Sequence, residues 1–365
     1  MANLRTRMSL SPALMLLGAS ILSAQVTYPN VKFAGRLQVQ FYALDNSDYQ
    51  ATGRVTSNFF LRRARIQVSG NISENVSLMI QPDFAGGRTI SNNRGGVRVR
   101  DAYIDVRLTK AEAKTSFTVR MGQEKRPYSR WELTSSNNLV SIERGAGQGL
   151  LQVATNDLFG GAGFLSHDVG AAFLVNHKLG DARAFTFQAG VYNGQGESAN
   201  DVNGKKSFGV RGTVDVTQKL SVGGSFFSHD AIQGTDSSFT NQAFGVDAAW
   251  NKPGEQGLYV LAEYLDGEAN NVTKDPMRGI SILGAYNIRM KSPTAWLYAI
   301  EPMARFDQAD PNTDVNDNAS TLFTAGFGLY FSSRAQFRVA YEHQSFQANG
   351  ATSINGVRTA MTVNF

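Results

Sequence analysis

The sequence predicts an all-β protein, a transmembrane antiparallel β-barrel with one loop folded into its lumen. Apolar and polar residues alternate with a period of two in segment after segment, and runs rich in Gly, Asn, Asp and Ser separate these segments. The composition agrees, with 36 Gly, 9 Pro and no Cys in 365 residues. The two ends add an apolar leader and an alternating segment that closes on Phe365. No long helical pattern competes with these strands.

The first 24 residues have the three parts of a secretory signal peptide. Arg5 and Arg7 form a positive region, "SPALMLLGASIL" is an apolar core, and Ala24 is a small residue at the expected cleavage site. A buried N-terminal helix is the weaker alternative, because the apolar core has signal length and is too short to span a bilayer. We therefore expect a signal peptide over 1–24 and a barrel over 25–365.

The first well-marked strand, "NFFLRRARIQVSG" at 58–70, carries three arginines. Even positions from Phe60 to Val68 form the apolar face that would meet lipid, so Arg63 and Arg65 are expected to point into the lumen, roughly 7 Å apart along the strand. By the same parity Arg62 faces lipid, which costs about 2–4 kcal/mol at the bilayer midplane. It must then lie near an interface, snorkel, or sit at a β-bulge that resets the parity.

The next two strands repeat the alternation. In "RDAYIDVRL" at 100–108, apolar residues alternate with Asp, Tyr and Arg side chains, and in "TSFTVRMG" at 115–122 they alternate with Thr and Arg. Arg107 and Arg120 are therefore expected on the lumen face. Pairing of such arginines with lumen carboxylates such as Asp83, Asp101 and Asp105 is an equally open interpretation.

Residues 123–149 break the strand period, and we expect them to fold into the pore as a constricting loop. The basic side chains of this segment would make the electrostatic potential of the lumen more positive. Its carboxylates would cancel much of that effect. The basic residues are Lys125, Arg126, Arg130 and Arg144, and the acidic ones are Glu124, Glu132 and Glu143.

The rest of the chain continues the same pattern. Further strands are expected within 184–194, 210–216, 220–227, 243–250, 258–265, 280–287, 300–307, 322–331, 336–345 and 358–365. Connections alternate between short and long, as they do between the two ends of an outer-membrane barrel, and Tyr330 and Phe331 are expected in an aromatic girdle. A β-sandwich would show the same period, but its polar face would meet bulk water, whereas here it mixes Arg, Asp, Glu, Gln and Tyr. Phe365 resembles the ending by which bacterial barrels are recognised by the barrel-assembly machinery.

Charge and motifs exclude several functions. The net charge is +5, without a continuous basic face, so no nucleic-acid partner is expected. There is no Cys, no His pair with metal spacing and no phosphate loop, so we expect no metal and no cofactor. Four scattered histidines give no nucleophile setting, and we expect no catalytic residue.

Several segments together resemble a known family. "FLRRARIQVSGNISENVSLMIQPDFAG", "VRDAYIDV" and "FTVRMGQEKRPYSRWELTSSNNLVSIERG" are similar to the N-terminal half of the phosphate-selective porins of the O and P type. The resemblance runs from about Val31 to the end of the chain, and its front half carries the specific motifs.

The resemblance implies a homotrimer of about sixteen-stranded barrels in the bacterial outer membrane, in contact with lipid and lipopolysaccharide. It implies passive diffusion of small anions, phosphate or polyphosphate among them, past a basic constriction. Its double arginine matches Arg62 and Arg63 and its lysine matches Lys125, so the family and the strand parity disagree about Arg62, and a bulge would reconcile them. The candidate anion-binding residues are Arg63, Arg62, Arg65, Lys125, Arg120 and Arg107.

One departure and three alternatives remain. Members of the family are lysine-rich in the outer vestibule, whereas the long loops here hold more Asp and Asn, so general anion preference is the safer expectation. A general non-specific porin is one alternative, and a barrel hydrolase is a weaker one. A purely adhesive or structural barrel would not need arginines along its lumen.

Overall fold

A computed structural model describes residues 27–45, 56–85, 96–151, 153–180, 182–233, 237–291 and 296–365. The expected signal peptide, residues 1–24, lies outside these ranges. Neither helix in the described part of the chain is long and apolar enough to cross a membrane.

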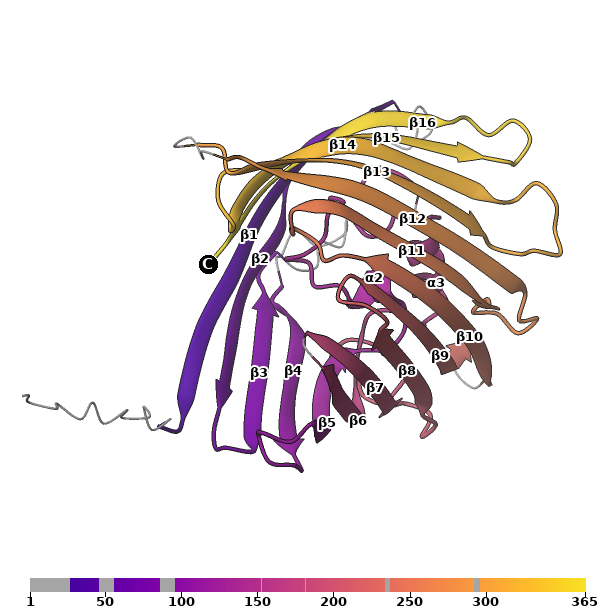
Figure 1. The fold of residues 1–365 in the computed structure, drawn as a ribbon. Coiled ribbons are helices and arrows are strands. Elements are labelled where there is room, and N and C mark those ends of the chain that lie inside the picture. Colours follow the sequence, from indigo (N-terminus) through magenta and orange to yellow (C-terminus); the bar gives the residue numbers. More distant parts are fainter. Residues whose placement is uncertain are drawn as a thin grey trace, which may run out of the picture.

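Sixteen antiparallel strands in the described residues form one closed barrel, in which each strand pairs with its sequence neighbours and β1 pairs with β16 (Figure 1). This architecture confirms the predicted fold class. The strands are β1 (Asn30–Asp45), β2 (Ser57–Asn71), β3 (Val76–Asp83), β4 (Arg98–Arg107), β5 (Thr115–Lys125), β6 (His167–Gly180), β7 (Arg183–Tyr192), β8 (Ser207–Asp215), β9 (Leu220–Gln233), β10 (Ser237–Trp250), β11 (Gly257–Glu268), β12 (Pro276–Arg289), β13 (Ala299–Asp310), β14 (Ser320–Tyr330), β15 (Ala335–Phe346) and β16 (Ile354–Asn364).

The two ends of the barrel differ in their connections. At the end where β1 begins and β16 finishes, tight turns such as 72–75, 216–219 and 331–334 join the strands. At the opposite end lie long connections such as 126–166 and 193–206. The alternation of loop lengths expected from the sequence is therefore present. We call the two ends the turn end and the loop end.

The strands alternate between an outer apolar face and an inner polar face. On β4 and β5 the outward residues Ile104 and Met121 are 53% and 63% exposed, while Arg120 and Asp105 pair on the inner face. Outward rings also pack across strands, as Phe117 and Phe173 do with centroids 5.9 Å apart. These strands have the faces predicted from their period.

One expected outward residue points inward instead. Tyr330, assigned to an aromatic girdle, donates its hydroxyl hydrogen bond to Glu301, which is buried on the lumen side of β13. The alternation of β14 explains the difference, because Phe323 and Phe327 occupy its exposed face and Tyr330 has the opposite parity.

The arginine strand contains a β-bulge at Arg62. Along the β1–β2 ladder Gln38 pairs with Arg63 and Val39 pairs with Leu61, so Arg62 is an extra residue on β2. The bulge resets the parity: Phe59 and Leu61 are exposed on the outer face, whereas Arg62 and Arg63 both point inward. The bulge is one of the alternatives that the sequence left open for Arg62. The expectation that Phe60 faces lipid was wrong, because Phe60 packs beside the buried Tyr42, while Arg63 and Arg65 point inward as predicted.

The connection from β5 to β6 folds into the barrel. It carries two short helices, α2 (Arg130–Leu133) and α3 (Thr155–Gly161), which Figure 1 shows inside the strands. We call residues 126–166 the inner loop. The expected constricting loop began at 123, but β5 continues to Lys125 because Gln123, Glu124 and Lys125 keep their ladder with β6.

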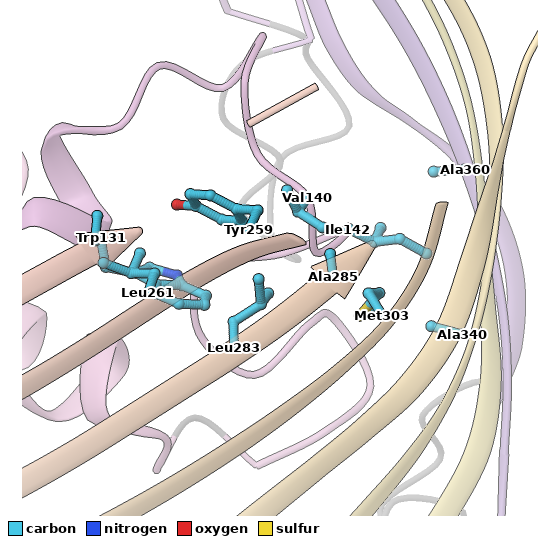
Figure 2. Packing of buried hydrophobic residues seen from close by; sticks show 11 residues of the cluster. Trp131, Val140, Ile142, Tyr259, Leu261, Leu283, Ala285, Met303, Ala340 and Ala360 are labelled. Carbon is cyan, nitrogen blue, oxygen red and sulfur yellow. The ribbon is translucent and has the colours of Figure 1, made fainter. Parts of the chain in front are cut away.

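Most of the apolar core lies between the inner loop and one side of the barrel. Trp131, Val140 and Ile142 of the loop cluster with Leu261 and Leu283 of the wall (Figure 2). A second cluster brings loop aromatics, including Tyr128 and Phe164, against Tyr192, Phe227 and Leu265. We call β8–β13 the packed wall and β1–β5 the open wall. The loop packs mainly on the packed wall. Its residues Ala146, Leu150 and Ala154 also pack against Tyr42 and Leu44 near the loop end of β1, and the cavity lies along the rest of the open wall.

Candidate functional site

A cavity of about 450 Å³ lies between the open wall and the inner loop. Its lining carries seven Arg and Lys side chains and four carboxylates, an excess of three positive charges when all are ionised. The basic residues are Arg36, Arg62, Arg63, Arg65, Arg100, Lys125 and Arg144, and the acidic ones are Asp101, Glu132, Glu143 and Asp157. Of the six residues predicted from the sequence, the structure brings four together here: Arg62, Arg63, Arg65 and Lys125.

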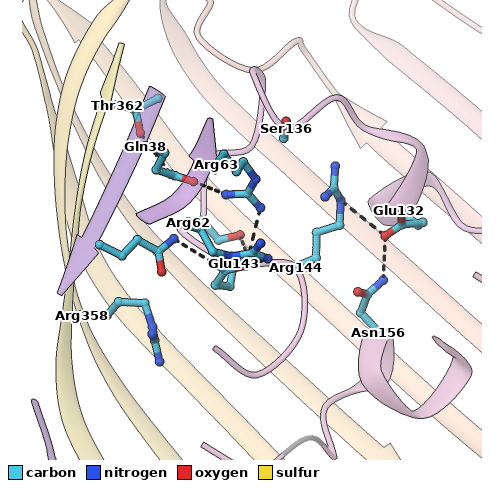
Figure 3. A network of polar contacts seen from close by, with 12 residues as sticks. Gln38, Arg62, Arg63, Glu132, Ser136, Glu143, Arg144, Asn156, Arg358 and Thr362 are labelled. Atoms are coloured by element: carbon cyan, nitrogen blue, oxygen red, sulfur yellow. Dashed lines mark hydrogen bonds and ion pairs between the residues drawn. The ribbon is translucent and has the colours of Figure 1, made fainter. Parts of the chain in front are cut away.

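Glu143 of the inner loop pairs with both bulge arginines (Figure 3). Its carboxylate accepts hydrogen bonds from Arg62 Nε at 2.6 Å and Nη2 at 2.8 Å, and from Gln40 Nε2 at 2.7 Å. Arg63 Nη2 lies 3.6 Å from it. Although burial alone would raise the pKa of Glu143, Arg62 and Arg63 hold it well below its ordinary range. The carboxylate is therefore ionised at neutral pH.

On the loop side of the cavity, Glu132 holds two further cations. Its carboxylate lies 3.5 Å from Lys125 Nζ and 3.5 Å from Arg144 Nε. Lys125 also donates to the Glu132 carbonyl oxygen. Burial would raise the pKa of Glu132, but Lys125 and Arg144 lower it to about 2. Two loop carboxylates therefore each bind cations that line the cavity.

Near the loop end, Arg65 and Arg100 share Asp83, with Nε–carboxylate distances of 2.7 and 3.6 Å. Arg100 and Arg98 are also paired with Glu197 from the 193–206 connection. Although burial would raise the pKa of Glu197, its neighbours His167, Arg100 and Arg98 lower it to about 2. The positive charges of this part of the lining are thus partly compensated.

Arg36 of β1 is the exception in the lining. It stands opposite Arg65 in the β1–β2 register and is 3% exposed. Within the described part of the chain, none of its three guanidinium nitrogens has a hydrogen-bond partner. A buried cation with unused donors is suited to an anionic ligand.

Sequence reasoning missed Arg36, although a signal was present. The segment Arg36, Gln38 and Gln40 alternates with Leu37 and Val39, so its polar face could have been recognised as a lumen face. Its strand was not among those singled out, and pairing with Arg65 depends on a register that the sequence does not give.

The structure places two predicted site residues elsewhere. Arg120 lies outside the cavity lining, where its guanidinium binds Asp105 at 2.7 and 2.8 Å and Glu124 at 2.8 Å and covers the Tyr103 ring. Arg107 lies at the turn end of β4, opposite Thr118, and also outside the lining. The structure therefore does not bring Arg120 and Arg107 to the other four.

Asp157 on α3 differs from the other acidic loop residues of the lining, because its pKa is raised and theirs are lowered. Burial raises its pKa to about 7, and the Ala146 backbone N–H, which donates to its carboxylate at 2.6 Å, offsets only part of that rise. Among the described residues no group of three or more His, Asp or Glu side chains could hold a metal ion.

Comparison with known proteins gives one family and a set of barrels. The sequence model of the family described as phosphate-selective porin O and P matches residues 31–259. No curated protein matches the chain in sequence. An anion-selective porin from Comamonas acidovorans superimposes with a TM-score of 0.62 at 13% identity, over 92% of this chain and 100% of that one.

Two further solved structures share the fold. The outer membrane channel DcaP of Acinetobacter baumannii has a TM-score of 0.61 at 14% identity, over 92% of this chain and 97% of that one. The trimer form of OmpT, an outer membrane protein of Vibrio cholerae, has a TM-score of 0.56 at 15% identity, over 92% and 99%. At these identities the likeness concerns the barrel fold.

Proposed function

This chain belongs to the phosphate-selective porin O and P family of bacterial outer-membrane channels, and we propose that it passes small anions by passive diffusion through the cavity beside the open wall. The observation that carries the proposal is the excess of cations in the lining, above all Arg36, which is buried and has no partner among the described residues. The family is one of channels, and it supports a channel in preference to an enzyme.

The proposed selectivity rests on charge and shape. Guanidinium forks match the oxygens of phosphate and similar oxyanions in pairs. Low-dielectric walls strengthen the attraction for an anion and the repulsion of a cation. Arg36 would make the first contact. Arg62, Arg63, Arg65, Lys125 and Arg144 would follow as their carboxylate partners yield. Conduction is supported because several weak sites let an ion step from one to the next.

Phosphate is the preferred solute in this proposal, and polyphosphate is a larger one of the same chemistry. The carboxylates that compensate most of the lining favour a modest preference over tight binding. We further propose a homotrimer embedded in lipid and lipopolysaccharide, with Phe365 as the contact for the barrel-assembly machinery. The inner loop would be the constriction.

Reversal potentials in planar bilayers under a KCl gradient test the proposal, followed by block of the chloride current with added phosphate. We expect an anion-selective reversal potential, and Arg36→Gln should reduce it. Arg107→Gln, which changes a residue outside the cavity, should not. Cation selectivity would overturn the anion channel, and anion selectivity unmoved by phosphate would leave a general anion porin.

A further inference from the structure

We infer that Glu143 is a built-in counter-anion for the bulge arginines: its carboxylate occupies the place that a solute oxyanion would take on Arg62 and Arg63, and so weakens solute binding there. This inference rests on the proposed anion channel and names the residue that sets its affinity.

The contact geometry is that of an anion in a guanidinium fork. Arg62 presents Nε and Nη2 to the two carboxylate oxygens at 2.6 and 2.8 Å, and these two donors would match two phosphate oxygens in the same way. Arg63 Nη2 lies 3.6 Å from the same carboxylate, and Gln40 adds an amide donor. The donors around Glu143 therefore form a ready oxyanion site that the protein itself fills.

The carboxylate is not the main anchor of its own segment. The Glu143 backbone carbonyl accepts hydrogen bonds from Arg305 Nη1 at 3.1 Å and Ser141 Oγ at 2.7 Å. The adjacent Ile142 is 2% exposed in the apolar cluster on the packed wall. Backbone and apolar contacts thus hold residues 141–143 on one side, while the carboxylate reaches the open wall on the other. Its distinct contribution is a negative charge in the cavity.

The same wall contains a natural comparison. Arg36 is buried with no partner among the described residues, whereas Arg62 and Arg63 have Glu143. A solute anion binds Arg36 without competition and must displace Glu143 to reach the bulge pair. Because Glu143 competes for Arg62 and Arg63, an anion that moves on from Arg36 is held only weakly at the bulge. Conduction requires such weak binding, since the anion must leave each site again.

Glu143→Gln tests the inference, because glutamine keeps the shape and removes the charge. We expect stronger anion selectivity and a half-blocking phosphate concentration about tenfold lower than in the unchanged channel. Glu143→Asp keeps the charge and should stay near the unchanged channel. The double variant Arg62→Gln with Glu143→Gln restores the original net charge and should return block close to its original strength.

The outcomes separate the inference from the proposed function. If Glu143 is only a loop tether, Glu143→Gln raises conductance and lowers anion selectivity, the double variant behaves likewise, and the counter-anion is overturned. If Arg36→Gln reduces selectivity while Glu143→Gln leaves phosphate block unchanged, the channel proposal stands and the counter-anion fails. If neither variant moves selectivity, the anion-channel proposal itself fails.

Discussion

The open and packed walls belong to one continuous barrel, yet their inner faces carry different chemistry. On the packed wall the lumen side of β11 holds Tyr259 and Leu261, both at most 5% exposed because the inner loop covers them. On the open wall the corresponding side of β1 and β2 holds Arg36 and Arg63, which line the cavity. The position of the pore is thus decided by where the loop docks.

Charged residues also differ between the walls. On the packed wall Asp247 binds Arg211 at 2.7 Å and also binds Arg130 of the loop. Ser129 and the Arg130 backbone N–H both donate to Glu263, at 2.7 and 2.6 Å. These groups fasten the loop, whereas Arg36 on the open wall has no hydrogen-bond partner in the described part of the chain. Charged residues therefore attach the inner loop to the packed wall, whereas we propose that on the open wall they contact the solute.

The largest expected effect comes from removing the apolar anchor. Trp131→Ala deletes a 3% exposed side chain from the packed cluster, together with the ring over which Arg305 lies at 4.7 Å. We expect a loss of about 3–5 kcal/mol of loop packing. Single-channel recording should show larger and noisier conductance with weaker anion selectivity. Val202→Ala, at an exposed loop position, is the control, and quiet wild-type-like channels from Trp131→Ala would show that the packed wall does not hold the loop.

Two deletions compare the bulge with a regular strand position. Deleting Arg62 removes the extra residue and leaves Leu61 and Arg63 on their present faces, so we expect assembled barrels. Deleting Ala64 shifts the parity and forces an arginine toward lipid, at a cost of about 2–4 kcal/mol near the midplane. Heat-modifiable mobility on gels measures assembly. Equal assembly of the two deletions would contradict the assigned bulge.

A matched pair of arginines compares the walls directly. Arg211→Gln breaks the ion pair with Asp247 on the packed wall and should cost about 1.5–3 kcal/mol of stability with little change in selectivity. Arg36→Gln should do the reverse, lowering anion selectivity while thermal unfolding shifts little or upward, because it removes a buried charge that has no partner among the described residues. Thermal melts and reversal potentials separate the two. If both variants shift the same observable, the walls do not have distinct roles.

The smallest expected effect is a pH dependence from Asp157. Because burial raises its pKa to about 7, the carboxyl loses its proton as pH rises from 6 to 8 and adds one negative charge to the cavity. Anion selectivity should therefore fall modestly over that interval. The depressed pKa values keep Glu132 and Glu143 ionised throughout. Asp157→Asn should flatten the profile at its low-pH level, and an unchanged slope would assign the titration to another group.

The sequence alone determined the barrel class, the faces of strands such as β4 and β5, and the inward direction of Arg63 and Arg65. These follow from a period of two, because lipid on one side and water on the other impose opposite polarity on successive residues. Residues 258–265 were expected only as one more strand, and the apolar inner face of β11 has its reason in the loop that covers it.

Tertiary structure decided the rest. Arg62 points inward because β1 pairs with β2 in a register that leaves one residue over, and no local pattern contains that register. Arg36 meets Arg65, and Glu143 meets Arg62 across a sequence separation of 81 residues, only once the barrel has closed and the loop has docked. Alternation fixes which way a side chain faces, whereas its partner depends on contacts between distant segments, which the closed barrel alone creates.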